Sequence, residues 1–191
     1  HGLGTTCEKT MPLASGPSTE LSSSGSPTTM ALAASAASFS TSASGRDVAT
    51  VPGGAACSGS LETGYRINLE SRIATRILLQ VARGPYRSEA EIYRLAYDVD
   101  WSRLFSVDRS IRVYVTAIRS PLKSLEFITL KVKDAVCDRF RADTGRRPSV
   151  NTKNPEVRIH LFITADQAAL YLDTSGEPLY VRGHKLAKVG A

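Results

Sequence analysis

Basic and hydroxyl side chains gather in the second half of this sequence, before, along and after one predicted long helix. Arginine can hold a phosphate through two parallel hydrogen bonds, and lysine, serine hydroxyls and free amides at a helix start also bind phosphate oxygens. We therefore predict a polyanion-binding surface. Its candidate residues are Arg119, Ser120, Lys123, Ser124, Lys131, Lys133, Arg139, Arg146, Arg147, Lys153, Arg158 and Arg182.

An alternative interpretation of these cations is an ordinary solvated surface. Asp134 and Asp138 lie within the same predicted helix. Oppositely charged side chains three or four residues apart on a helix form ion pairs. The cations would then be neutralised by their neighbours, and the sequence alone leaves both interpretations open.

Motifs that carry catalysis are missing from the sequence. It has no G-x-G-x-x-G turn, no Walker A loop, no zinc-ligand spacing and no nucleophile-elbow serine. His1, His160 and His184 are far apart and have no acidic residues at helical spacing, and we expect His160 on the outer face of a strand beside Arg158. We predict no catalytic residue, no metal site and no cofactor bound by this chain.

The charge of the chain is as uneven as its composition. Residues 1–45 are about two-thirds Ser, Thr, Ala and Gly and show no helical or strand period. Residues 1–60 have a net charge of −1, so with +6 overall residues 61–191 carry +7. Such an excess favours an anionic partner, namely RNA, DNA or a membrane face.

Neither a membrane segment nor a targeting signal is expected. The apolar stretch 30–39 is interrupted by serines and is shorter than the roughly 20 residues that span a bilayer. Cys7, Cys57 and Cys137 share no metal-ligand spacing, and their odd number argues against a closed disulfide framework. A reducing cytoplasm is the simplest setting.

Hydrophobic periodicity predicts the elements of the first half. Residues 47–51 and 54–57 are typical of two short strands around a turn. Leu61, Tyr65, Leu69 and Ile73 recur every four residues and predict a helix that buries this stripe. A buried strand over residues 73–82 should follow.

The second half shows stronger patterns. Ser88 and Glu91 form a capping box for a helix to about residue 99, with Trp101 and Phe105 clamping its end. The helix core face should hold Ile92, Leu95, Ala96 and Val99.

Alternation then predicts a strand over 111–118, and a long helix should run from an N-cap at Ser124 to a stop at Gly145. Its buried stripe should hold Leu125, Ile128, Val132, Ala135, Val136 and Phe140.

Two strands that suit a hairpin, over 157–163 and 170–172, and an extended piece over 179–182 complete the chain. Interleaved strands and helices without a repeat indicate an α/β or α+β fold in which helices pack on a mixed sheet.

Several motifs in order carry a family resemblance. Residues 119–150 read RSPLKSLEFITLKVKDAVCDRFRADTGRRPSV, residues 157–162 read VRIHLF, and residues 172–183 read LDTSGEPLYVRG. This series resembles the THUMP region of bacterial large-subunit rRNA guanine-N2-methyltransferases. Upstream, residues 59–79 are similar to the end of the ferredoxin-like subdomain that precedes THUMP in that family.

The resemblance implies four parts of the chain. Residues 46–84 would be a partial ferredoxin-like subdomain, residues 85–184 the THUMP RNA-binding domain, and residues 185–191 the start of a connection to a methyltransferase domain that this sequence lacks. Residues 1–45 would be a low-complexity segment, disordered or non-native, which leaves an edge of the ferredoxin-like sheet unpaired.

The implied function is an RNA-binding module that captures structured large-subunit rRNA. A separate S-adenosyl-L-methionine-dependent domain would methylate the base, so the chain alone should not be catalytic. The alternatives are the RNA-binding domain of another RNA-modifying enzyme, such as a tRNA methyltransferase or thiouridine synthase, and an inactive truncated fragment.

Overall fold

The computed structural model of the chain describes residues 28–33, 46–51, 54–71, 74–176 and 178–179. These residues form one seven-stranded sheet in the order β2-β3-β1-β4-β7-β6-β5. The strands are β1 Thr28–Ala33, β2 Arg46–Val51, β3 Gly54–Gly59, β4 Arg76–Pro85, β5 Ile111–Ala117, β6 Val157–Ile163 and β7 Gln167–Asp173. The helices are α2 Leu61–Glu70, α3 Glu89–Tyr97, α4 Leu125–Thr144 and the 3-10 turn η1 Trp101–Arg103.

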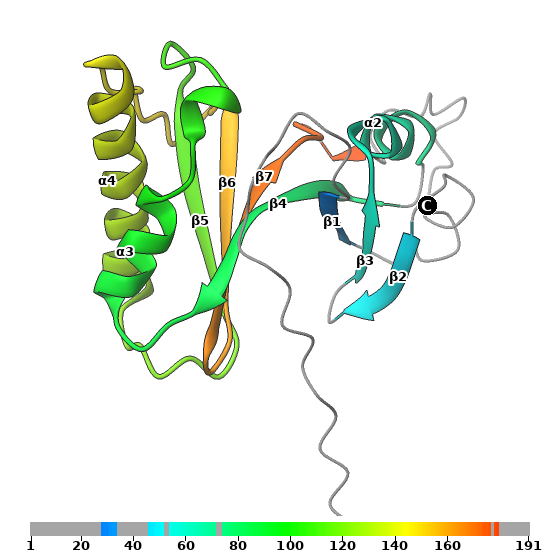
Figure 1. Cartoon of the computed structure of the whole chain (residues 1–191), viewed down its shortest axis with the longest axis horizontal. Helices are drawn as coiled ribbons and strands as arrows, with labels where there is room; N and C mark the ends of the chain where they lie inside the picture. Colours follow the sequence, from blue (N-terminus) through cyan, green and yellow to red (C-terminus); the bar gives the residue numbers. More distant parts are fainter. Residues whose placement is uncertain (1–27, 34–45, 52–53, 72–73, 177, 180–191) are drawn as a thin grey trace, which may run out of the picture.

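Strand β4 belongs to both halves of the sheet (Figure 1). Its first residues pair antiparallel with β1, and its pairing with β7 continues to its end at Pro85, past a bulge between Gln80 and Ala82. Helices α3 and α4 cover one face of β5, β6 and β7, while α2 packs on the half that holds β1 and β3. The predicted mixed sheet with packed helices is confirmed.

Residues 28–33 form strand β1 between β3 and β4. We expected residues 1–45 to be a low-complexity segment without structure, and that expectation is wrong for this strand. An interior strand gains backbone hydrogen bonds on both sides, and these do not depend on a strong apolar pattern. The edge that we expected to be unpaired is therefore filled, and the remaining residues of 1–45 lie outside the described residues.

Helix α2 forms where it was predicted but turns a different face to the sheet. Leu61, Tyr65 and Leu69 are 56%, 68% and 79% exposed, so the predicted buried stripe is wrong, and Ile73 lies outside the described residues. Thr63 and Ile67 are buried instead. A Cβ on Gly59 would stand 2.9 Å from the Thr63 side chain. Position 59 at the end of β3 therefore has no room for a side chain beside Thr63.

The predicted α3 region is confirmed. Ser88 Oγ accepts the N–H of Glu91 at 3.4 Å, and Glu91 Oε2 accepts the N–H of Arg87 at 2.6 Å. Trp101 is fully buried, its indole N–H donates to the carbonyl of Ala96 at 2.8 Å, and the Phe105 ring contacts it edge-on. The end of α3 is therefore fixed by side chains as well as by its cap.

Helix α4 crosses from β5 to β6, which run parallel. Ser124 Oγ accepts the N–H of Phe127 at 3.2 Å, and Gly145 ends the helix at a φ of 71°, where glycine is favoured. Five of its six predicted core residues are buried, but Leu125 is 38% exposed. The hairpin of β6 and β7 is confirmed, and of the extended piece 179–182 only Leu179 lies within the described residues.

Two substitutions in α2 distinguish the observed face from the predicted one. We expect Ile67→Ala to lower the free energy of unfolding by about 2–4 kcal/mol, because Ile67 is fully buried. The matched Leu69→Ala should change it by less than about 0.5 kcal/mol, because Leu69 is largely exposed. Denaturant titration followed by circular dichroism measures both, and the reverse order would contradict the described orientation of α2.

Candidate nucleic-acid interface

Helix α4 divides the predicted phosphate-binding residues between two ends of the domain. Residues 118–124 precede its first turn, whereas residues 145–156 follow its last turn. A helix of 20 residues spans about 30 Å. The surface that we predicted as one cluster is therefore two, at opposite ends of α4 (Figure 1).

The 118–124 loop carries exposed cations. Arg119 has a φ of 55°, a left-handed conformation that non-glycine residues adopt rarely and that tends to occur at functional sites. Arg119 and Lys123 are both exposed, and neither forms an ion pair with any residue that the structure describes. Their charges are therefore available to an anionic ligand.

A chain of hydrogen bonds anchors this loop. The Tyr86 hydroxyl donates to the carbonyl of Thr164 at 2.6 Å, which uses its only proton. The Ser120 hydroxyl, 2.8 Å away, must therefore donate to Tyr86 Oη, and it accepts the N–H of Leu122 at 3.2 Å. Ser120 thus holds the loop in place, and its proton is not free for a phosphate as we had predicted. The Ser124 hydroxyl likewise accepts an amide of its own helix.

Strand directions bring a further cation to this end. Strands β4 and β6 each run antiparallel to β7, and β5 runs parallel to β6, so β4, β5 and β6 share one direction. Arg87, just after β4, therefore lies at the same end as Arg119, and it is exposed. The sequence analysis missed Arg87, although it precedes the capping box that was recognised.

Two arginines at the opposite end of α4 are already paired with carboxylates. Arg146 contacts Asp108 at 2.7 Å, and this hydrogen bond holds the pKa of that carboxyl below its usual range. Arg147 lies 3.5 Å from Asp138. Lys153 is exposed. For Arg146 and Arg147 the structure supports the alternative interpretation of neutralised surface charge.

Two of the remaining candidate residues are also paired with carboxylates, and the others have different contacts or lie outside the described residues. Arg139 pairs with Asp143 at 2.8 Å, and Lys133 pairs with Asp134 at 2.9 Å. The Lys131 ammonium lies 5.3 Å from the centre of the Phe127 ring. Arg158 donates to the carbonyl of Gly176 at 2.9 Å. Arg182 lies outside the described residues.

His160 lies on the sheet face away from α4, as predicted. Its ring stacks on Tyr114 with centroids 5.0 Å apart. Burial lowers its pKa, and its Nε2 stands 3.9 Å from Asp173 Oδ2. Burial thus favours the neutral imidazole. No group of three or more His, Cys, Asp or Glu residues within the described ranges is placed to hold a metal ion.

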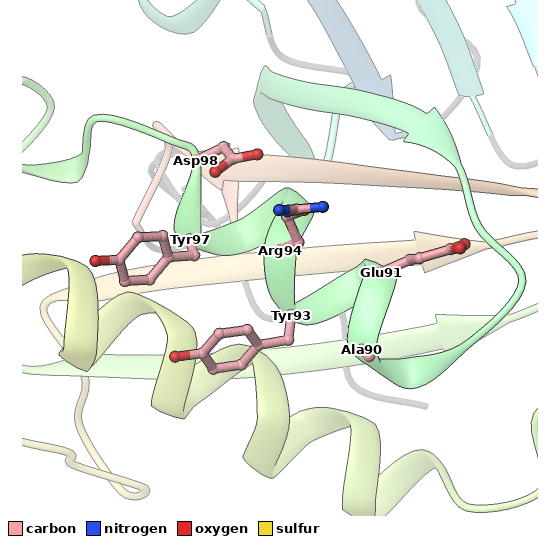
Figure 2. A pocket seen from close by; sticks show the side chains of 6 residues that line it. All are labelled: Ala90, Glu91, Tyr93, Arg94, Tyr97 and Asp98. Atoms are coloured by element: carbon pink, nitrogen blue, oxygen red, sulfur yellow. The ribbon is translucent and has the colours of Figure 1, made fainter.

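A surface hollow on α3 offers a less suitable site for an anion (Figure 2). It is lined by Ala90, Glu91, Tyr93, Arg94, Tyr97 and Asp98. The two tyrosines point toward α4, where the Tyr93 hydroxyl donates to Asp138 at 3.0 Å. Burial and this carboxylate raise the pKa of Tyr93. Because two carboxylates line the hollow and only one arginine does, it does not favour phosphate.

Comparisons with known protein families match two consecutive regions. Residues 86–173 match the THUMP domain, and residues 41–78 match the RlmL ferredoxin-like domain. Relatives named ribosomal RNA large subunit methyltransferase K/L are 41% identical over 133 residues in Pseudomonas aeruginosa and 38% over 135 residues in Desulfotalea psychrophila. These alignments cover 70% and 68% of this chain but 18% of each relative.

Solved structures share the fold. A protein described as a predicted N6-adenine-specific DNA methylase from Listeria monocytogenes superposes with a TM-score of 0.71 at 22% identity, covering 86% of this chain and 44% of that one. A 4-thiouridine synthetase, solved as an RNA complex with bound ATP, gives 0.52 at 10% identity, covering 78% and 41%. At these identities the likeness concerns the fold alone.

A conservative substitution tests the anchor of the 118–124 loop. We expect Tyr86→Phe to lower the free energy of unfolding by about 1–2 kcal/mol, because the carbonyl of Thr164 and the hydroxyl of Ser120 lose their shared partner. It should also speed hydrogen exchange at the amide of Leu122. Tyr114→Phe is the control, since no hydrogen bond of its hydroxyl occurs in the part of the chain that the structure describes. Equal effects of the two variants would refute the anchoring role.

Proposed function

We propose that this chain is an RNA-binding module, because residues 86–173 match the THUMP domain and residues 41–78 match the RlmL ferredoxin-like domain. It would hold structured RNA for modification by a catalytic domain outside residues 1–191. The single observation that carries the proposal is the cationic end formed by Arg87, Arg119 and Lys123, which are exposed and form no ion pair with another described residue.

Phosphate recognition is the mechanism that this end supports. Contacts to the RNA backbone supply most of the affinity of such proteins and depend on salt, because bound cations release counterions. Structured RNA is recognised largely through its shape and its phosphates. A loop that is anchored by Tyr86 and Ser120 presents Arg119 and Lys123 in a fixed arrangement, which lowers the entropy lost on binding.

Glu126 and the acidic first turn of α3 limit where a phosphate can approach. Glu126 follows the N-cap of α4, and Glu89 and Glu91 lie in the first turn of α3. These carboxylates already interact favourably with the positive ends of the two helices and would repel a phosphate. The side chains of Arg119 and Lys123, rather than the helix starts themselves, are therefore the proposed contacts.

The substrate that we propose is large-subunit rRNA, after the names of the relatives. The catalytic partner would be a domain that uses S-adenosyl-L-methionine, and the chain spans less than a fifth of the relatives that it matches. We place its action in the cytoplasm, a setting that suits the free thiol of Cys137. No helix among the described residues could cross a membrane.

A second candidate is the RNA-binding part of another modifying enzyme. The fold is shared with the 4-thiouridine synthetase that was solved with RNA, so the THUMP fold alone does not select the chemistry. Competition between large-subunit rRNA fragments and tRNA for the chain distinguishes the two. Preferential binding of tRNA would favour the second candidate.

Charge-removal variants at the two ends test the proposed contacts. Arg119→Ala with Lys123→Ala should weaken RNA binding and reduce the slope of log affinity against log salt by about one to two, because up to two phosphate contacts are lost. Arg146→Ala with Arg147→Ala removes the same charge but breaks existing ion pairs, so its effect on the slope should be smaller. Fluorescence anisotropy at several salt concentrations measures both.

The order of the two effects decides the assignment. A larger slope change for Arg146 and Arg147 would move the interface to the far end of α4. Unchanged slopes for both double variants, with both proteins folded by circular dichroism, would overturn phosphate recognition by either end.

A further inference from the structure

The sheet has a second face, on the side opposite α3 and α4. The core under these helices takes Ile159, Leu161 and Leu170 from β6 and β7. Side chains alternate along a strand, so the intervening residues point the other way. Strand register aligns them in rows across β5, β6 and β7. One row is Tyr114, His160 and Tyr171, and the next is Thr116, Phe162 and Ala169.

The rings on this face differ in what already covers them. The Tyr114 ring contacts both the Arg112 guanidinium, 4.7 Å from its centre, and the His160 ring. Phe162, in contrast, is 36% exposed and meets Tyr171 edge-on at 5.5 Å and 87°. Phe162 therefore offers apolar ring surface to a ligand, and Tyr171 supports it from the side.

This exposed ring lies at the same end of the sheet as the 118–124 loop. Thr116 pairs with Phe162, and Ile118, which is 50% exposed, donates its N–H to the carbonyl of Ile163 at 2.8 Å. Arg119 follows directly. We call Ile118, Phe162 and Tyr171 the aromatic patch.

A cation borders the patch on its other side as well. Arg83 pairs with Ala169, which in turn pairs with Phe162. The Cα atoms of Arg83 and Phe162 therefore lie two strands apart, at about 10 Å. Arg83 is exposed and forms no ion pair with any residue in the described ranges. The aromatic patch thus lies between Arg83 and Arg119.

We propose that the aromatic patch binds unpaired bases of a single-stranded RNA segment by stacking, with Arg83 and Arg119 contacting the phosphates on either side. This rests on the proposed function and adds to it the part of the RNA that this face recognises. A base stacked on a ring next to arginines is the arrangement by which proteins hold single strands with little sequence preference. Charge complementarity selects this occupant, since an uncharged protein surface would leave both guanidinium groups without a partner.

The test compares single-stranded RNA with a matched strand that has lost its bases. The probes are a fluorescently labelled decamer of adenosine and an abasic ribose-phosphate decamer of the same charge. Phe162→Ala should weaken binding of the adenosine decamer by about tenfold, the scale of one lost stacking contact. It should leave binding of the abasic strand and the salt slope unchanged. Phe162→Tyr keeps a ring and should bind like the original chain.

Each outcome supports or overturns the proposal. Equal loss for both strands, or no loss for either, would overturn base stacking at Phe162. A loss with Phe162→Ala that Phe162→Tyr does not restore would also overturn it, because the ring itself would not be the contact. The phosphate proposal is tested separately. Arg119→Ala with Lys123→Ala should weaken binding of the adenosine decamer and of the abasic strand by the same factor. Phe162→Leu serves as the folding control, because it keeps apolar volume without a ring.

Discussion

The rest of this structure depends on strand β4, which pairs with both halves of the sheet. Leu78 and Leu79 pair with β1 on one side and with β7 on the other. Leu79 also packs against both hydrophobic cores of the protein. A shift of β4 by one residue would turn its side chains to the opposite faces in both halves at once. The register of this strand therefore fixes both halves of the sheet together.

Polar contacts at the end of β7 reinforce the same junction. Arg76 contacts Asp173, whose side chain is fully buried, at 2.5 Å. The Thr174 hydroxyl donates to the carbonyl of Ile77, and the Ser175 hydroxyl accepts the N–H of Ile77. The side-chain amide of Asn68 in α2 donates to the Thr174 hydroxyl. Because this junction is fixed and the three strands share one direction, β4, β5 and β6 finish at the same end of the sheet. The connections that follow β4 and β5 therefore place Arg87 and Arg119 at that end. The cationic end is thus a consequence of strand direction rather than of neighbouring positions in the sequence.

Much of the fold could be predicted from the sequence, because local signals agree with tertiary packing. Ser88, Ser124 and Gly145 cap the helices where expected, and alternation located β5 and β6. Strand β1 could not be predicted, since its stability comes from two neighbours that are distant in sequence. The buried face of α2 was predicted wrongly for a related reason: Thr63 lies against Gly59 at the end of β3, and Ile67 packs in the core formed with Cys57, Ile77 and Leu179, contacts that the helical period alone does not show.

The arrangement of the candidate site could not be predicted from the sequence. Residue types could indicate phosphate binding, but only the fold separates the two ends of α4 and shows which cations already have carboxylate partners. NMR chemical-shift mapping of the labelled chain with single-stranded RNA tests this account most directly. We predict that the shifted amides lie in residues 118–124 and around Phe162, and that residues 145–156 change little. Shifts confined to residues 145–156, or none at saturating RNA, would contradict the account.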